Sequence, residues 1–215
     1  MKTVRGQPHA DSSPVPSAMQ AGSFAYQGKG ACLLLYFSAC GILNSISRSY
    51  NGGSRMQIEQ NRITLAPMTA ERYCSFFLNY ENDPDMYLPG QQYIHYEYSE
   101  ERVKKYVQRQ KNLRRIPLAV LCGDEVVGEI IIKNIKPHHC ATMGIVLKND
   151  QYKNRGIGTQ AERLVVQYVF DDLDIPTLYA DTIQTNSRSQ HVLEKVGFTF
   201  IREDRDFKYY RIDRS

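Results

Sequence analysis

The sequence predicts a mixed α+β domain, and two observations lead to this class. From Met56 onward, short runs rich in β-branched residues alternate with stretches whose apolar residues recur at helical spacing. Most neighbouring strand-like runs are joined by short polar turns, as in hairpins, whereas one long helical stretch separates two of them, as in a βαβ crossover. We therefore expect one hairpin-rich sheet with a single crossover and helices packed against it.

The predicted elements follow one another closely along the domain. Thr69 is a candidate helix cap after the first strand, and Ser99 with Glu100 and Glu101 starts a helix whose acids suit the positive end of its dipole. A turn at Gly123 joins two strands as a hairpin. Strands are predicted at 63–69, 116–122, 125–135, 143–147, 177–183, 198–203 and 207–213. Helices are predicted at about 70–80, 99–111, 157–169 and 187–195, and turns or loops at 82–92 and 136–142.

Composition and charge exclude several classes of protein. The chain of 215 residues is 42% hydrophobic and 23% charged, which suits a soluble globular protein with one core. Its net charge of +4 arises within residues 1–55, where five basic residues face one acid, so residues 56–215 are formally neutral. We therefore predict no nucleic-acid-binding surface on the folded part.

Residues 1–55 differ from the rest because they are rich in Ser and Gly and show no sustained periodicity. Their apolar run at 31–43 is shorter than the roughly 20 residues that cross a bilayer, and it lies too far from the start for a secretory signal. We interpret 1–55 as a leader or appended segment, disordered or non-native. The domain at 56–215 is expected to be cytoplasmic, without membrane contact.

The stretch 144–170 combines a strand, a basic glycine turn and an amphipathic helix. Gly156 and Gly158 lack a Cβ, so the backbone can adopt positive φ and a ligand can approach its N–H groups closely. The helix that follows leaves unpaired N–H groups at the positive end of its dipole. With Lys153 and Arg155 beside it, this turn is a candidate phosphate-binding site.

Two other interpretations of the glycine turn compete with this one. The letters GIGTQA also satisfy the dinucleotide-binding pattern GxGxxA, and Asp181 imitates its ribose-binding acid. However, the segment 148–155 separates the strand from Gly156, and only about sixty residues follow, too few for a doubly wound sheet. The phosphate-loop pattern GxxxxGK[ST] is absent. The second alternative is a helix that merely starts after a glycine turn.

A second stretch, ADTIQTNSRSQHVLEKVGF at 180–198, decides between these interpretations. Together, the two stretches resemble the GNAT superfamily of acetyl-CoA-dependent N-acetyltransferases. The first family motif, Q/R-x-x-G-x-G/A, falls on 153–158, and the second is close to the Rim-type branch, whose best-known members acetylate N-termini of ribosomal proteins. The residues that match the second motif are Asn186, Ser189, Val192, Leu193, Glu194, Gly197 and Phe198.

The resemblance covers roughly residues 60–213 and implies the GNAT fold, a central twisted, mostly antiparallel sheet of about seven strands flanked by about four helices. It also implies acetyl-CoA as co-substrate and no metal. Lys153 replaces the usual Gln or Arg, so its side-chain contact with the pyrophosphate is less secure than the backbone contacts. A backbone N–H of 145–147 is expected to contact the thioester oxygen. The expected acetyl-CoA-binding residues are Ile145, Val146, Leu147, Lys153, Asn154, Arg155, Gly156, Ile157, Gly158, Thr159 and Asn186.

Acetyl transfer from a thioester to an amine needs a neutral amine, a stabilised oxyanion and a proton for the leaving thiolate. Many family members take that proton from a Tyr seven residues after the Asn, but Leu193 occupies this position here. The resemblance to the Rim-type branch implies that Ser189 contacts the sulfur instead. The alternative is that Ser189 only stabilises its short helix.

The sequence offers three candidates for the general base. Rim-type relatives often carry an acid on the strand before the glycine turn, where this chain has Thr142. Glu129 is our first candidate, and Glu97 and Asp181 are the others. An α-amino group has a pKa of about 7.7–8.0 against about 10.4 for Lys, so it depends less on a base. We therefore expect a peptide N-terminus or an activated small amine as the acceptor.

The loop at 80–98 is rich in aromatic and acidic residues and is expected to line the acceptor side. Its acidity suits a cationic partner such as a peptide amine, a polyamine or an aminoglycoside. The chain is expected to be a monomer or homodimer. A non-catalytic acyl-CoA-binding sensor is the alternative, because the Tyr and the strand acid are missing. The loop residues in question are Asp83, Asp85, Tyr87, Tyr93, His95 and Glu97.

Three further patterns favour ordinary structural roles. His138, His139 and Cys140 are adjacent and have no partner pair elsewhere, so they predict a turn and no metal site. The five cysteines are odd in number and form no paired framework, which indicates reduced thiols. Arg188 and His191 are expected on the solvated side of their helix.

Overall fold

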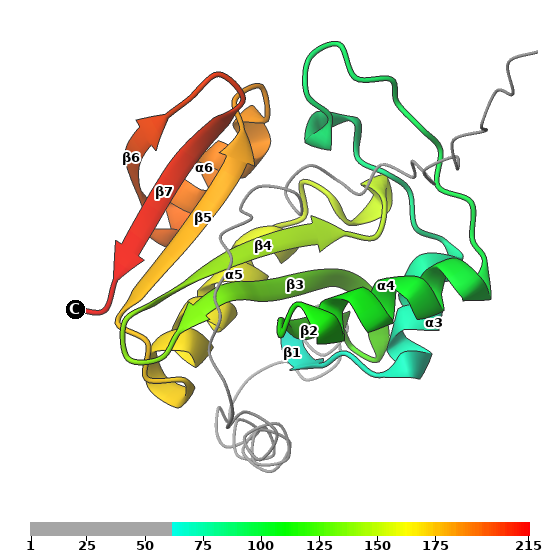
Figure 1. Cartoon of the computed structure of the whole chain (residues 1–215), viewed down its shortest axis with the longest axis horizontal. Coiled ribbons are helices and arrows are strands. Elements are labelled where there is room, and N and C mark those ends of the chain that lie inside the picture. Colours follow the sequence, from blue (N-terminus) through cyan, green and yellow to red (C-terminus); the bar gives the residue numbers. More distant parts are fainter. Residues whose placement is uncertain (1–61) are drawn as a thin grey trace, which may run out of the picture.

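The computed structural model describes residues 62–215. The leader predicted at 1–55 and the predicted domain start at Met56 lie outside the described residues. Within 62–215, strands and helices follow one another in the predicted order, which confirms the mixed α+β class (Figure 1).

One sheet of seven strands forms the centre of the described part of the domain. Its order is β1-β2-β3-β4-β5-β7-β6, and every neighbouring pair is antiparallel except β4 and β5. The mostly antiparallel sheet of the GNAT fold is therefore confirmed. The strands are β1 (Ile63–Pro67), β2 (Ile116–Cys122), β3 (Glu125–Lys136), β4 (Cys140–Leu147), β5 (Thr177–Ile183), β6 (Thr199–Glu203) and β7 (Phe207–Asp213).

Four α-helices in the described range flank the sheet, and the first two begin at the predicted caps. The Thr69 side chain accepts a hydrogen bond from the backbone N–H of Arg72, and the Ser99 side chain accepts one from Arg102. The helices are α3 (Ala70–Leu78), α4 (Glu100–Asn112), α5 (Ile157–Gln167) and α6 (Ser187–Val196). Shorter turns are η4 (Pro84–Met86), η5 (Asp150–Tyr152) and η6 (Tyr168–Asp172), the last a π-helical continuation of α5.

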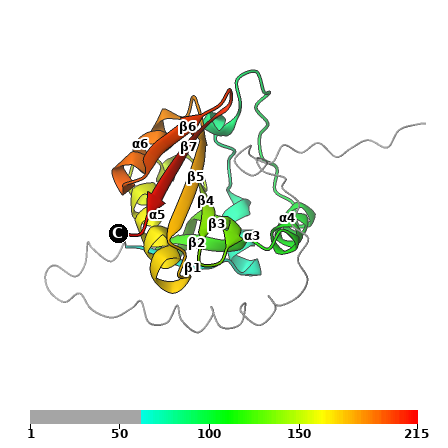
Figure 2. The ribbon, with the colours of Figure 1, turned by 60° about the vertical axis from the view of Figure 1, so that its left-hand side comes forward.

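The helices cover both faces of the sheet, with α5 and α6 on one side and α3 and α4 on the other (Figure 2). Beneath α5 and α6, a core of buried apolar residues includes Ile130 of β3, Val165 of α5 and Leu193 of α6. Beneath α3 and α4, a second, aromatic core includes Phe76 of α3 and Ala119 of β2. Burial of these apolar side chains fixes how the helices sit on the sheet.

The parallel strands β4 and β5 pair for only part of their length. Residues 140–143 pair with 177–180, and beyond this point the two strands diverge (Figure 1). Residues 144–147 still pair with β3 on their other side, and 181–183 still pair with β7. Among the described residues, the two edges that face each other across the gap therefore have no strand partner. We call this gap the fork.

Several predicted boundaries were wrong. The first strand ends at Pro67 and the first helix at Leu78, each two residues earlier than predicted. The turn expected at 136–142 is shorter, because Cys140 already pairs with Lys136 of β3 and with Thr177 of β5. The helix expected to end near 169 continues as η6 to Asp172, which carries the chain towards β5. The apolar periodicity of the helix does not distinguish an α-turn from a π-turn at its end.

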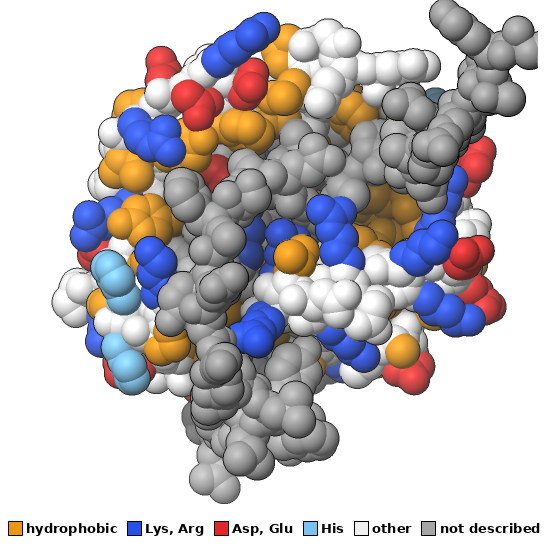
Figure 3. All heavy atoms as spheres, in the orientation of Figure 1, with side chains coloured by type: hydrophobic (Ala, Val, Ile, Leu, Met, Phe, Trp, Pro, Cys, Tyr) orange, Lys and Arg blue, Asp and Glu red, His pale blue; other side chains and the backbone are white. Residues whose placement is uncertain are grey.

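The face of the domain seen in Figure 3 carries both signs of charge. Where the described residues are visible, Lys and Arg side chains lie among Asp and Glu side chains. This mixture agrees with the formal neutrality of residues 56–215. Within 62–215, the structure contains no helix that is long and apolar enough to cross a membrane.

Candidate active site

A large cavity of the described domain lies in the fork. It has a volume of about 710 Å³ and is bounded by the diverging ends of β4 and β5 and by the first turns of α5 and α6. We call it the fork cavity. Of the residues predicted to bind acetyl-CoA, those lining it are Ile145, Val146, Leu147, Lys153, Asn154, Gly156, Gly158, Thr159 and Asn186.

The glycine turn forms one wall of the fork cavity. Gly156 has φ +76°, a left-handed conformation, and it is the N-cap residue of α5 without any side-chain cap. The N–H groups of the first helical turn are thus left for a ligand. A Cβ at Gly158 would meet no atom within 4 Å, so a ligand can approach the backbone there. This geometry suits a phosphate at the helix N-terminus.

Two residues of the predicted turn do not face this cavity. Ile157 is 4% exposed and packs in the core between the sheet and α5. Arg155 is exposed, and its guanidinium donates to the backbone carbonyl of Gln151. Neither side chain lines the fork cavity.

Lys153 lines the fork cavity, but carboxylates already neutralise its charge. Its Nζ lies 3.0 Å from Asp83 Oδ1 and also pairs with Asp150, and the side chain is 9% exposed. A pyrophosphate would have to compete with both carboxylates for this ammonium. The backbone N–H groups at 156–159 are therefore the stronger anion-binding feature of the turn.

Asp83 links the acceptor-side loop to both walls of the fork. It is buried, and its other oxygen pairs with Arg188 of α6, which also lies 3.2 Å from Asp85. Arg188 is half-buried and His191 is exposed, and both line the cavity, a placement that the sequence did not indicate. The first turn of α6 faces the fork, which the periodicity of this short helix does not reveal.

Ser189 and Asn186 lie where α6 begins. The Asn186 side chain accepts a hydrogen bond from the backbone N–H of Ser189 at 3.0 Å, so Asn186 is the cap of the helix. Ser189 lines the fork cavity, and its hydroxyl group makes no hydrogen bond within residues 62–215. The hydroxyl is thus available to a ligand.

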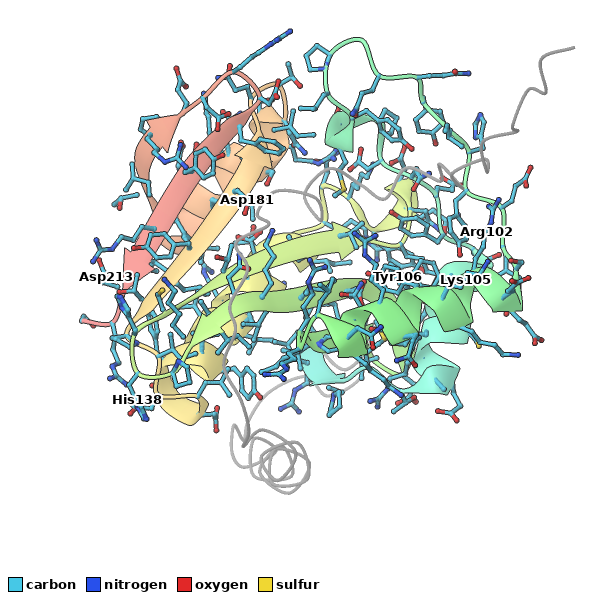
Figure 4. The ribbon with its side chains drawn as sticks, in the orientation of Figure 1. Arg102, Lys105, Tyr106, His138, Asp181 and Asp213 are labelled. Carbon is cyan, nitrogen blue, oxygen red and sulfur yellow. The ribbon has the colours of Figure 1, made fainter. Side chains whose placement is uncertain are left out.

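Asp181 is a buried carboxylate at the fork (Figure 4). One oxygen lies 3.3 Å from Lys133 Nζ, and the other, Oδ2, is enclosed without a hydrogen-bond partner. Burial raises the pKa of Asp181, and the Lys133 ammonium opposes that rise. Asp181 lines the cavity, which makes it a candidate contact for an acceptor amine.

Glu129 lies on the other side of β4 from the fork. It is 1% exposed. The side chain of Tyr106 extends from α4 towards the sheet (Figure 4), and its hydroxyl donates a hydrogen bond to Glu129 Oε2 at 2.5 Å. Burial raises the pKa of Glu129 to about 7, partly offset by this hydrogen bond. Glu129 lines neither the fork cavity nor the second cavity of the domain.

Glu162 also faces the fork, although its place in the sequence did not mark it as a candidate. It lies in α5, is 1% exposed and lines the fork cavity, and its Oε2 has no hydrogen-bond partner. Burial alone raises its pKa to about 8. Its spacing of three and seven residues from Val165 and Val169, on the apolar face of the predicted helix, was a sign of burial.

The acceptor-side loop divides between two cavities. Asp83 and Met86 line the fork cavity, whereas Tyr93 and His95 line a second, mostly polar cavity of about 540 Å³. Tyr152 lines both cavities. The predicted acceptor loop therefore borders the fork cavity through η4.

The described residues 62–215 contain no group of three or more His, Cys, Asp or Glu side chains that could hold a metal ion. His138 lies at the other end of the sheet from the fork (Figure 4). Its Nδ1 is 3.0 Å from Asp174 Oδ2.

A family model for the acetyltransferase (GNAT) domain matches residues 62–199. The uncharacterized N-acetyltransferase YnaD of Bacillus subtilis (strain 168) is 26% identical over 102 residues, which cover 46% of this chain and 59% of that protein. Spermidine N(1)-acetyltransferase of Escherichia coli (strain K12) is 25% identical over 95 residues, which cover 44% and 50%. The chain thus spans about half the length of the curated relatives it matches.

Solved structures share the fold at low sequence identity. Aminoglycoside acetyltransferase AAC(6')-Ib in complex with coenzyme A superposes with a TM-score of 0.58 at 16% identity, over 71% of this chain and 95% of that one. The ribosomal-protein-S5-alanine acetyltransferase from Vibrio fischeri gives 0.53 at 15% identity, over 70% and 92%. At these sequence identities, the similarities show a shared fold alone.

Proposed function

The chain belongs to the GNAT acetyltransferase domain family, and on that premise we propose that it transfers the acetyl group of acetyl-CoA to a primary amine. The amine is that of a small molecule or a peptide N-terminus, as in the Rim-type branch. The observation that carries this proposal is the fork cavity, where a gap between β4 and β5 meets the uncapped N-terminus of α5.

The fork suits acetyl-CoA in shape and chemistry. The uncapped helix start at Gly156 offers N–H groups to the pyrophosphate. The unpaired β4 edge at 144–147 offers backbone groups to the amides of the pantetheine arm, and one of its N–H groups can stabilise the thioester oxyanion. AAC(6')-Ib, which shares the fold, is described with coenzyme A bound.

We propose that Asp181 binds the amino group of the acceptor. Its enclosed Oδ2 lacks a partner and its side chain lines the cavity, so it can hold the amine and accept a proton as the amine attacks. Glu129, the first candidate from the sequence, is less well placed, because it lies under Tyr106 and outside the cavity. Ser189 remains our proposed contact to the sulfur.

The Asp181 carboxylate favours a small cationic acceptor. It lines the fork cavity and its Oδ2 has no hydrogen-bond partner within 62–215, whereas Asp83 already pairs with Lys153 and Arg188. Among the relatives, one is named for spermidine and another for aminoglycosides. We therefore place polyamines and aminoglycosides ahead of peptide N-termini as acceptors.

The test is thiol release from acetyl-CoA by the full chain, with a panel of polyamines, aminoglycosides and N-terminal peptides. Turnover with any amine supports an enzyme and identifies the substrate class. Calorimetry with acetyl-CoA runs alongside. Binding without turnover across the panel would contradict transfer and support the non-catalytic sensor instead.

A further inference from the structure

Glu162 is buried without a counter-charge. Its Oε2 has no hydrogen-bond partner, and within residues 62–215 its carboxyl group makes no ion pair. A charged carboxylate in such a place is costly, and protonation removes much of that cost. Burial raises its pKa to about 8, so at neutral pH the group is mainly a carboxylic acid with a proton to donate.

Glu162 and Leu193 lie at similar depth along neighbouring helices. α5 and α6 pack against each other, and each begins at the fork. At 1.5 Å per residue, Glu162 is about 9 Å beyond the cap residue Gly156, and Leu193 is about 10 Å beyond Asn186. Both line the fork cavity. Because helical side chains lean towards the helix N-terminus, the Glu162 carboxyl group is directed towards the fork.

The position of Leu193 is where many GNAT members carry the Tyr that protonates the leaving thiolate. Leu193 is 2% exposed and apolar, so α6 supplies no acid at this position. The thiolate still needs a proton at neutral pH for the products to be released as thiol and amide. A carboxylic acid on the facing helix can fill this role.

We propose that Glu162 is the catalytic proton donor to the sulfur of coenzyme A. This inference rests on the proposed acetyltransferase function. The neutral amine attacks the thioester carbon, a C–N bond forms and the C–S bond breaks. The amine proton passes to Asp181 or water, the Glu162 proton passes to the sulfur, and solvent then reprotonates the Glu162 carboxylate.

The titratable groups that share the cavity do not replace Glu162 in this role. They are Asp83, Tyr152, Lys153, Asp181, Arg188, His191 and Lys195. Desolvation is the sole cause of the raised Glu162 pKa, so none of these groups contributes to it. The acid form of Glu162 is lost as the pH rises through about 8. The turnover number at saturating substrates should therefore fall on the alkaline side, near pH 8.

The test compares Glu162→Gln and Glu162→Met with the unsubstituted full chain. With acetyl-CoA and a saturating accepted amine, both variants should lose roughly a hundredfold in kcat, a typical contribution of a general acid. The decline near pH 8 should disappear. With p-nitrophenyl acetate as donor, whose phenolate leaves without protonation, transfer to the same amine should stay within about threefold.

Two controls separate catalysis from structure. Glu100→Gln on the exposed start of α4 should change nothing, and melting temperatures report folding. Glu162→Met keeps the test valid if the Gln variant misfolds, because an apolar side chain of similar length suits the buried position. Equal losses with both donors, or an unchanged kcat with acetyl-CoA, would overturn the role of Glu162 alone. No turnover by the unsubstituted chain would instead overturn the proposed function.

Discussion

Asp83 Oδ1 lies 3.0 Å from Lys153 Nζ, and this ion pair joins the acceptor-side loop to the phosphate-binding turn. The same carboxylate also pairs with Arg188 on α6. One buried Asp thus holds the loop across the mouth of the fork cavity. The two cations that could attract a phosphate are therefore partly neutralised before any ligand arrives.

Replacement of Asp83 should loosen this arrangement. Asp83→Asn removes a buried carboxylate from two cations, although Asp150 and Asp85 remain as partners, so we expect a loss of about 1–2 kcal/mol of unfolding free energy. The freed cations should bind acetyl-CoA more tightly and with steeper salt dependence. Chemical denaturation and calorimetry at two salt concentrations measure both effects.

The control for this prediction is Asp85→Asn. Asp85 is half exposed and contacts Arg188 alone among the ion pairs of 62–215, so its loss should cost less than about 1 kcal/mol. If the two variants are equally stable and bind acetyl-CoA equally, Asp83 does not hold the loop.

Gly156 allows a test of the anion site at the glycine turn. Gly156→Ala forces a Cβ into the left-handed region, which costs about 1–2 kcal/mol, and it disturbs the N–H groups offered to the pyrophosphate. Gly123, with φ +62° in the β2–β3 turn, provides a matched strain away from the site. Gly123→Ala should lower the melting temperature to a similar extent while acetyl-CoA affinity is retained. Equal affinities for the two variants would contradict an anion site at the turn.

The hydrogen bond from Tyr106 to Glu129 should govern stability above neutral pH. Because burial raises the Glu129 pKa from 4.5 to about 7, unfolding free energy should fall as the pH rises between these values. Tyr106→Phe removes a stabilising hydrogen bond, so the decline should extend beyond pH 7 and deepen by about 1–3 kcal/mol. Melting temperatures at pH 5.5 and 8.5 measure this.

Glu129→Gln provides the reference, because it cannot titrate. The contribution of Glu129 to the pH dependence of stability should vanish, which leaves the declines due to Glu162 and Asp181. If Tyr106→Phe and the unsubstituted protein lose stability in parallel from pH 5.5 to 8.5, the hydrogen bond does not support the charged form of Glu129.

Ser189→Ala tests the proposed contact to the sulfur. The loss of one hydrogen bond should reduce kcat by roughly three- to tenfold, because a neutral hydrogen bond contributes about 0.5–1.5 kcal/mol. Stability should hardly change, since Asn186, not the Ser189 hydroxyl, caps the helix. Steady-state kinetics with acetyl-CoA and an accepted amine would decide, and full turnover would remove Ser189 from the mechanism.

Local signals made much of the fold predictable from the sequence. Thr69 and Ser99 cap their helices through contacts three residues away, and the glycines at 156 and 158 lie within one turn. Such short-range chemistry is visible in a single sequence. The crossover from β4 to β5 was predictable because one long amphipathic helix separates two strand-like runs.

Contacts between distant segments explain what the sequence could not reveal. Asp83 and Arg188 are 105 positions apart, and no periodicity connects them. Glu162 is a charged residue beside an apolar stripe, a pattern that also describes a solvated helix edge. The packing of α6 against α5 decides its burial, as the position of Glu129 beneath α4 decides its distance from the fork.

The fork also leaves β4 and β5 joined over only part of their length. Among the described residues, strand pairing joins β1–β4 to β5–β7 only from Cys140–Thr177 to Met143–Ala180. A ligand bound in the fork would contact both β4 and β5, and it would stabilise the folded domain by mass action. Amide hydrogen exchange at 144–147 and 181–183 should therefore slow when acetyl-CoA is added, while exchange in β2 stays constant. If the exchange slows at both edges, the co-substrate occupies the place where a strand would pair with β4 and β5.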